Sequence, residues 1–330
     1  MSKTIIGTSF SPMLNRKFKT GQLLCITLGL LVLFSCNNTT VKKEAHLFNQ
    51  LSSKTSGIGF QNILTENDSV NYFNYMYIYM GGGVAIGDLN NDGLQDVYFT
   101  GNMVENKLYL NKGSMQFEDI TEEAGVGGDA RWATGVTMGD ANQDGWLDIY
   151  VSVSGKWETT KNLLYINDAN EGGVPTFTES AEAYGLADEG NSTQAVFFDY
   201  KDGTFTDENL NLTNHTSYFG MGLDVGDFNN DGLLDIYQVD MMPKNYRRAK
   251  ENMDSMDPER FYNIVDNDMH HQYSINTLQM NLGNNPSGLP FFADIAKFTG
   301  LSATDWSWAS LFADFDNDGW KDVYVTNGVR

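Results

Sequence analysis

The sequence predicts an all-β fold, a propeller built from repeated units of four short strands. Four nonapeptides share the pattern Asp-x-(Asp/Asn)-x-Asp-Gly-x-x-Asp and begin at residues 88, 140, 227 and 314. Each lies between segments in which β-branched and aromatic residues alternate with others, and this alternation favours a strand on both sides of the turn. The loop starts are 52, 87 and 87 residues apart, and about 50 residues per four strands is typical of a propeller blade.

The composition indicates a folded, acidic chain. Of its 330 residues, 41% are hydrophobic, which is enough for a sizeable core. Lys and Arg number 21 against 43 Asp and Glu, so the net charge is -22. This charge repels a phosphate backbone, and we therefore expect no nucleic-acid partner.

The N-terminal segment has the pattern of an export signal. Residues 1–35 contain four basic side chains, no acidic ones, and the 12-residue apolar run 23–34, which is shorter than the roughly 20 residues of a membrane-spanning helix. Ser35 and Cys36 follow in the manner of a bacterial lipobox. We predict a lipoprotein signal peptide over 1–35, lipidation of Cys36 and a tether over 36–57. Simple secretion with Cys36 unmodified is the alternative.

The nonapeptides have the chemistry of calcium loops. Positions 1, 3, 5 and 9 supply oxygen-bearing side chains, the glycine at position 6 permits a sharp turn, and the carbonyl at position 7 can add a ligand. Mg²⁺ prefers a smaller octahedron that retains waters, and transition metals prefer His or Cys, which these loops lack. Hairpin turns alone would explain the glycine but not four oxygen positions in register in four loops. We predict about four bound Ca²⁺ ions. The predicted ligands are Asp88, Asn90, Asp92, Leu94 and Asp96; Asp140, Asn142, Asp144, Trp146 and Asp148; Asp227, Asn229, Asp231, Leu233 and Asp235; and Asp314, Asp316, Asp318, Trp320 and Asp322.

The fourth loop is expected to bind most tightly. Asp316 stands where the other loops have Asn, so this loop carries four carboxylates. A fifth, degenerate loop at Asp199 is expected to bind no ion, because Lys201 adds a positive charge and the acid of the ninth position is missing.

The propeller predicted over residues 58–330 is irregular. Third strands are expected at 106–111, 162–167 and 276–281, and fourth strands at 117–121, 177–180 and 292–295. Residues 193–210 look like a blade without its middle, and 240–274 like an insertion between second and third strands. The last blade stops after its second strand, so we interpret the chain as a fragment. Residues 59–65 resemble a fourth strand and are a candidate to complete that blade.

The four loops, each followed by Asp-(Val/Ile)-Tyr, resemble the FG-GAP/VCBS-type repeats of integrin-α-like β-propellers. The phrases GGGVAIGDLNNDG, STQAVFFDY, HHQYSINTLQMN and DWSWASLFADFDNDGWKDVYVTNG resemble cartilage acidic protein-like (ASPIC/UnbV-associated) repeat lipoproteins of Bacteroidota. The resemblance covers the chain from about residue 60 onwards. It implies a surface or periplasmic binding module. Together with the calcium loops and Cys36, it leads us to expect a calcium-binding, lipid-anchored adhesion module at the outer membrane, on its surface or its periplasmic face, that recognises a glycan or a protein.

Two groups of side chains could carry further chemistry. A carbohydrate-active enzyme, for example a polysaccharide lyase, is the alternative function, and it would need Arg247, Arg248, His270 and His271 to converge; local packing and salt bridges are the simpler interpretation. No catalytic residues are therefore assigned. Eight residues before the loops stand Met80, Trp132, Phe219 and Trp306, with Trp308 two residues further on. These side chains could stack on sugars, although packing inside the fold is favoured.

Overall fold

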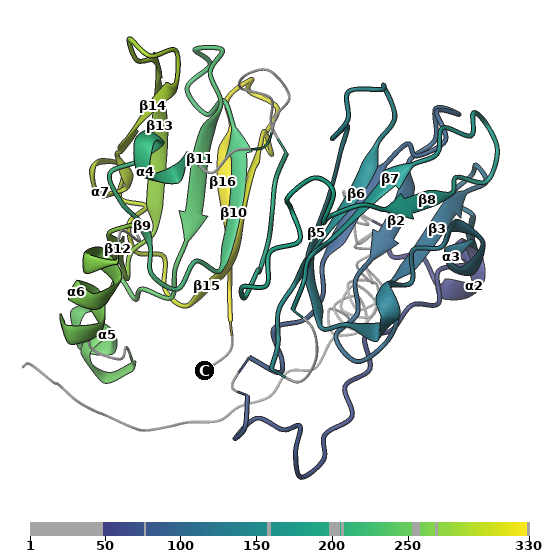
Figure 1. Ribbon diagram of the computed structural model, residues 1–330, viewed down its shortest axis with the longest axis horizontal. Helices are drawn as coiled ribbons and strands as arrows, with labels where there is room; N and C mark the ends of the chain where they lie inside the picture. The colour runs from purple at the N-terminus through teal and green to yellow at the C-terminus, as the bar shows by residue number, and fades with distance from the viewer. Residues whose placement is uncertain are drawn as a thin grey trace, which may run out of the picture. The chain divides into compact units, whose positions relative to one another are not determined.

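The computed structural model describes residues 49–328 apart from 76, 157–159, 198–204, 206–207, 253–257 and 268–269 (Figure 1). The chain divides into two compact units, Met1–Gln50 and Leu51–Arg330, and all the sheets lie in the second. The predicted signal peptide, Cys36, Asp199 and Lys201 lie outside the described residues. Among the residues that are described, no helix has both the length and the hydropathy needed to cross a bilayer.

Four antiparallel sheets, which we call blades 1 to 4, form the fold of the described residues, and in each the strands pair in chain order. The predicted all-β class is confirmed, and blades 1 to 3 each have the predicted four strands (Figure 1). Blade 1 consists of β1 (Val84–Gly87), β2 (Asp96–Phe99), β3 (Lys107–Asn111) and β4 (Phe117–Asp119). Blade 2 consists of β5 (Ala133–Gly139), β6 (Asp148–Val153), β7 (Leu163–Asn167) and β8 (Phe177–Glu179). Blade 3 consists of β10 (Gly222–Gly226), β11 (Asp235–Val239), β13 (Thr277–Asn284) and β14 (Pro290–Asp294), and blade 4 of β15 (Ser307–Ala313) and β16 (Asp322–Asn327).

Helices are short and lie in the connections between strands. The two longest, α5 (Tyr246–Asn252) and α6 (Pro258–Asp266), come between β11 and β13, inside the segment interpreted from the sequence as an insertion. The last part of this segment, β12 (Gln272–Tyr273), forms a small parallel pair with β9 (Thr216–Ser217), which precedes β10. The remaining helical turns are α2 (Ser53–Ser56), α3 (Thr121–Ala124), the 3-10 turn η1 (Gly128–Ala130), α4 (Asn209–Leu212) and α7 (Ala296–Thr299).

The tyrosine that follows each loop shows why the repeat folds as a complete blade. Tyr98 and Tyr237 are completely buried, and their hydroxyls donate to the carbonyls of Val126 and Leu301 in the turn after the fourth strand, at 2.6 and 3.0 Å. Tyr150 is buried in the same way in blade 2. A buried hydroxyl needs a partner, so each tyrosine fastens the second strand to the end of its own blade.

Glycines beside or within the first strands of blades 1 and 3 allow the next first strand to approach. A Cβ added at Gly83 would lie 2.9 Å from the Thr134 carbonyl oxygen of β5, and one at Gly222 would lie 2.6 Å from the Trp308 carbonyl oxygen of β15. Real Cβ atoms do not come this close to backbone, so these positions exclude side chains. The inner strands of blades 1 and 2, and of blades 3 and 4, therefore pack directly on each other.

The segment interpreted as a degenerate blade connects blades 2 and 3. None of the described residues between 193 and 208 is in a strand, but Thr193 lies against Gly135 of β5 as β5 lies against β1. The Thr193 hydroxyl donates to the carbonyl of Gly220 at 3.0 Å. Gln194 accepts from the backbone N–H of Leu223 at 3.4 Å. The segment thus occupies the place of an inner strand between β5 and β10.

Residues 59 and 60 pack on blade 1, so the expectation that the segment 59–65 completes the last blade is wrong. The Phe60 ring stacks on Phe99 with 5.2 Å between centroids, and the Gly59 N–H donates to the Tyr109 hydroxyl at 3.3 Å. These partners belong to β2 and β3, and the segment contains no strand. Its resemblance to a fourth strand reflects an aromatic residue that needs burial rather than strand pairing.

Candidate metal sites

The four nonapeptides fold as four similar tight loops between the first and second strands of each blade. The glycine at position 6 has φ between 83° and 90° in every loop, a conformation that side chains disfavour. The residue at position 4 is also left-handed, with φ between 55° and 62°. The two groups are Gly93, Gly145, Gly232 and Gly319, and Asn91, Gln143, Asn230 and Asn317.

Backbone N–H groups orient the carboxylates of positions 1 and 5. The first carboxylate accepts from the N–H groups of positions 5 and 6 at 2.8–3.1 Å in all four loops. The carboxylate at position 5 accepts from the N–H of position 7 at 2.8–2.9 Å. Hydrogen bonds of this kind are charge-assisted, so they hold the side chains in place while other oxygen lone pairs stay available.

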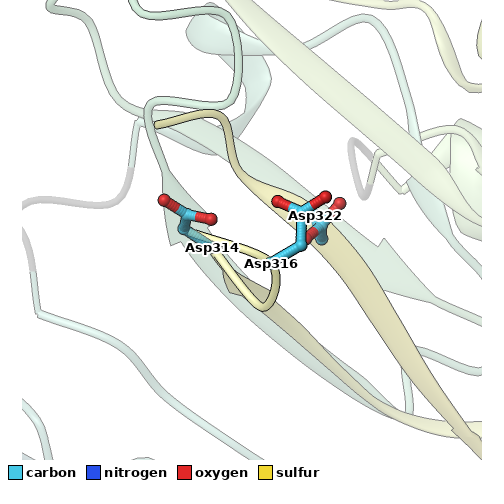
Figure 2. A group of neighbouring side chains, drawn as sticks. All are labelled: Asp314, Asp316 and Asp322. Carbon is cyan, nitrogen blue, oxygen red and sulfur yellow. The ribbon is translucent and has the colours of Figure 1, made fainter. Parts of the chain in front are cut away.

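Position 3 distinguishes the fourth loop from the others. In the first three loops the Asn amide donates to the carboxylate at position 5 at 2.8–3.1 Å. Asp316 cannot donate in this way, and one carboxylate oxygen each from Asp314, Asp316 and Asp322 lie within 4.8 Å of one another (Figure 2). Three negative charges at this separation repel, and a cation between them offsets the repulsion. Among the described residues, this is the group of acidic side chains best placed to hold a metal ion.

The aspartate at position 9 joins the loop to the third strand. Asp96, Asp148 and Asp235 are fully buried, and each accepts one N–H from loop position 2 and another, at 2.8 Å, from the Asn at the end of the third strand. Burial raises the pKa of all three carboxyls, that of Asp96 to about 6, and the neighbouring loop carboxylates add to the rise. Asp322 is exposed and accepts from the N–H of Phe315 at 3.0 Å.

The donor set fits a hard divalent cation. Each loop offers oxygen atoms from three or four carboxylates and up to one amide, with no nitrogen or sulfur ligand among the predicted positions. In the fourth loop the structure brings together the carboxylates of positions 1, 3 and 9. In the first three loops it places the side chains of positions 3 and 5 in contact, and the ligation by these positions stays a prediction. The carbonyls of Leu94, Trp146, Leu233 and Trp320 stay predicted ligands.

Asparagines at the two ends of the third strand are site residues that the sequence analysis did not assign. Asn111 donates its backbone N–H to Asp96, and Asn106 accepts the N–H of Gly101 at 2.9 Å, which fixes the end of β2. Asn162 and Asn276 accept equivalent N–H groups in blades 2 and 3 at 2.7 Å. The repeated Asn-x-x-x-x-Asn spacing is the sequence signal that could have found them.

The basic side chains considered for catalysis have local partners, and among these four described residues only the rings of His270 and His271 lie against each other, with 6.3 Å between centroids. Arg247 pairs with Glu251 on α5, and Arg248 pairs with Asp305. His270 shares a hydrogen bond with Thr213 at 2.9 Å, and desolvation lowers its pKa. The His271 ring lies against Phe261. These contacts explain the four side chains as local packing and ion pairing.

The side chains that stand eight residues before the loops, and Trp308, pack in the fold together with Tyr75 and Tyr77. Met80, Phe219, Trp306 and Trp308 belong to one hydrophobic cluster together with Tyr77. Trp132 is buried, and the Tyr75 ring meets it edge-on at 5.6 Å. This packing favours a structural role for these side chains over stacking on a sugar.

Together, the antiparallel blades and the four oxygen-lined loops define an all-β repeat protein of the propeller class. Residues 88–151, which include the first two loops, match the model of the family described as FG-GAP-like repeat. The chain is similar to cartilage acidic protein 1 of Xenopus tropicalis, with 33% identity over 93 residues, which cover 28% of this chain and 14% of that protein. It is also similar to integrin alpha-8 of Gallus gallus, with 28% identity over 155 residues, covering 42% and 15% respectively. The chain thus spans about one seventh of the length of each relative.

Proposed function

We propose that this protein is a calcium-stabilised binding or adhesion module that recognises a glycan or protein partner at the cell surface. The observation that carries the proposal is the same preoriented carboxylate loop in four successive blades. Similarity to an integrin alpha chain and to FG-GAP-like repeats supports a binding role. Calcium would link the first two strands of each blade and offset the repulsion among the loop carboxylates.

The charge balance supports a structural role for about four ions. Without residues 1–35 the chain has 17 basic and 43 acidic side chains, a net charge of -26, and four Ca²⁺ ions would reduce this to -18. Extracellular modules bind calcium with dissociation constants of about 10⁻⁴ to 10⁻³ M, and we propose this range here.

A comparison of binding with and without calcium tests the proposal. The protein from residue 37 onwards would be applied to a glycan array and, separately, to immobilised surface proteins, in CaCl₂ and in a chelator. We expect capture in calcium and its loss in the chelator. Equal capture under both conditions, or no capture on either surface, would contradict the proposal.

The location of the module rests on the N-terminal segment. We propose that residues 1–35 are removed and that Cys36 is acylated, so that the polar tether 36–57 holds the module at the outer membrane. Replacing Cys36 by Ser is expected to release the protein or to stop its processing. Normal maturation and membrane retention of Cys36→Ser would exclude the lipid anchor.

A further inference from the structure

The segment 66–80 exposes three aromatic rings on its outer side. Phe73 is 94% exposed, Tyr79 is 63% and Tyr72 is 48%. The rings of Tyr72 and Tyr79 lie nearly parallel, with 6.3 Å between centroids and 21° between planes, and Phe73 meets Tyr72 edge-on at 6.2 Å. We call Tyr72, Phe73 and Tyr79 the aromatic platform. Because apolar rings are normally removed from water, an exposed group of this kind marks an interaction surface.

Amide side chains hold the segment in one conformation. Asn67 accepts the backbone N–H groups of Ser69 and Val70, both at 2.9 Å. The Asn74 amide donates to the carbonyls of Asp68 and Ser69 at 3.1 and 3.2 Å. These bonds replace the backbone pairing that a loop lacks, so the rings are presented on an ordered turn.

The opposite side of the segment is anchored in the fold. Ile78 is completely buried, and Tyr75 packs edge-on against Trp132 of blade 2. Tyr77 and Met80 pack into the hydrophobic cluster of blades 3 and 4. The segment thus directs one set of apolar side chains inward and leaves the platform outside, which reduces the entropy lost when a ligand binds.

We propose that the aromatic platform binds a neutral glycan by stacking against the C–H faces of its sugar rings. Aromatic rings supply large contact areas for such faces, and the exposed carboxylates of Glu66 and Asp68 can accept hydrogen bonds from sugar hydroxyls. Glu66 already accepts from the Tyr79 hydroxyl, so one carboxylate lies at the edge of the platform.

Charge favours a neutral glycan over a polyanionic glycan or an apolar protein surface as the ligand of the aromatic platform. The net charge of -22 disfavours a polyanionic glycan. An apolar protein surface would supply no donor for the Glu66 lone pairs that the Tyr79 hydroxyl leaves unpaired, which is unfavourable on burial, whereas a sugar supplies hydroxyl donors. The inference rests on the proposed binding role and names the chemistry of its ligand.

Affinity electrophoresis tests the platform directly. Native gels containing galactomannan, mixed-linkage β-glucan, α-mannan or dextran would be compared with gels containing alginate and with polymer-free gels. Phe73→Ala removes the most exposed ring, and Phe298→Ala is the matched control, because Phe298 is 92% exposed on α7 outside the platform.

We expect at least one neutral polymer to retard the wild-type protein and Phe298→Ala equally. Phe73→Ala should weaken the retardation by about three- to tenfold, the value of one stacked ring. No retardation by any neutral polymer, retardation by alginate alone, or equal loss in both variants would overturn the inference. Thermal unfolding of the same samples with and without calcium is the separate readout for the proposed function. A calcium response without retardation rejects the platform alone, and retardation without a calcium response rejects the role of calcium alone.

Discussion

Removing the buried aspartate of the second loop should destabilise the protein even when no calcium is present. Asp148 is fully buried and accepts the N–H groups of Ala141 and Asn167, both at 2.8 Å. Asp322 occupies the same position in the fourth loop but is exposed and accepts one N–H, from Phe315. Asp148→Ala and Asp322→Ala therefore remove the same side chain from two different environments.

The magnitude follows from the orphaned donors. Each buried N–H left without an acceptor costs about 1–3 kcal/mol, so Asp148→Ala loses about 2–6 kcal/mol. Burial raises the pKa of Asp148, which means that its charged form is costly inside the protein. Removing this carboxylate therefore recovers part of the loss. We expect a net destabilisation of about 2–4 kcal/mol, or roughly 5–15 °C in Tm, and about 0–1 kcal/mol for Asp322→Ala.

Urea unfolding in calcium-free buffer, followed by tryptophan fluorescence, measures both changes. Asp148→Asn keeps one acceptor oxygen, so its free energy of unfolding should fall between those of wild type and Asp148→Ala. The asparagine variant also remains measurable if the alanine protein does not fold. Equal losses for the Ala variants at 148 and 322 would show that the ninth position has no structural role of its own.

Three further predictions concern proton binding, blade packing and ion occupancy. Burial raises the pKa of Asp96 from 3.8 to about 6. In calcium-free buffer the contribution of this carboxyl to stability is therefore present below about pH 4 and is lost as the pH rises through 6. A plot of Tm against pH should show this fall, and Asp96→Asn should flatten it. A Cβ at Gly135 would lie 2.5 Å from a backbone carbonyl oxygen, whereas one at Gly173 meets nothing closer than 3.7 Å. In urea unfolding, G135A should therefore lower the free energy of unfolding by about 1–3 kcal/mol and G173A by about 0.5 kcal/mol or less. Similar values for the two variants would refute the close packing. Terbium bound at the loops should luminesce when the neighbouring Trp146 and Trp320 are excited. If the fourth loop binds most tightly, W320F should remove the luminescence at the lowest terbium concentrations, while W146F retains it.

Local chemistry explains why the loops and their strands could be predicted from the sequence. A glycine with positive φ, carboxylates at fixed spacing and a following Asp-(Val/Ile)-Tyr all act within about ten residues, so one blade specifies its own first two strands. The pairing of all four strands followed from the repeat period, because equivalent residues must make equivalent contacts.

Contacts between distant segments could not be predicted in this way. The contact of Tyr75 with Trp132, and the packing of Tyr77 in the same hydrophobic cluster as Trp306, depend on where a loop without a repeat pattern folds back. The sequence predicts a strand over residues 59–65, but Phe60 instead stacks on Phe99. Hydrophobic burial is non-directional, so it does not require strand pairing. Asp322 is exposed because a third strand is what buries the ninth position in the other blades, and blade 4 has none among its described residues.

The most direct test of the account is the effect of calcium on thermal unfolding of the wild-type protein. At about 10 mM CaCl₂, a site with a dissociation constant of about 10⁻⁴ to 10⁻³ M adds about 1.4–2.7 kcal/mol of stability. Differential scanning calorimetry at low salt should therefore show a Tm at least about 5 °C higher in CaCl₂ than in calcium-free buffer, with a much smaller change in equimolar MgCl₂. An unchanged Tm in CaCl₂ would contradict the account, because four loops of preoriented carboxylates would then bind no ion that stabilises the fold.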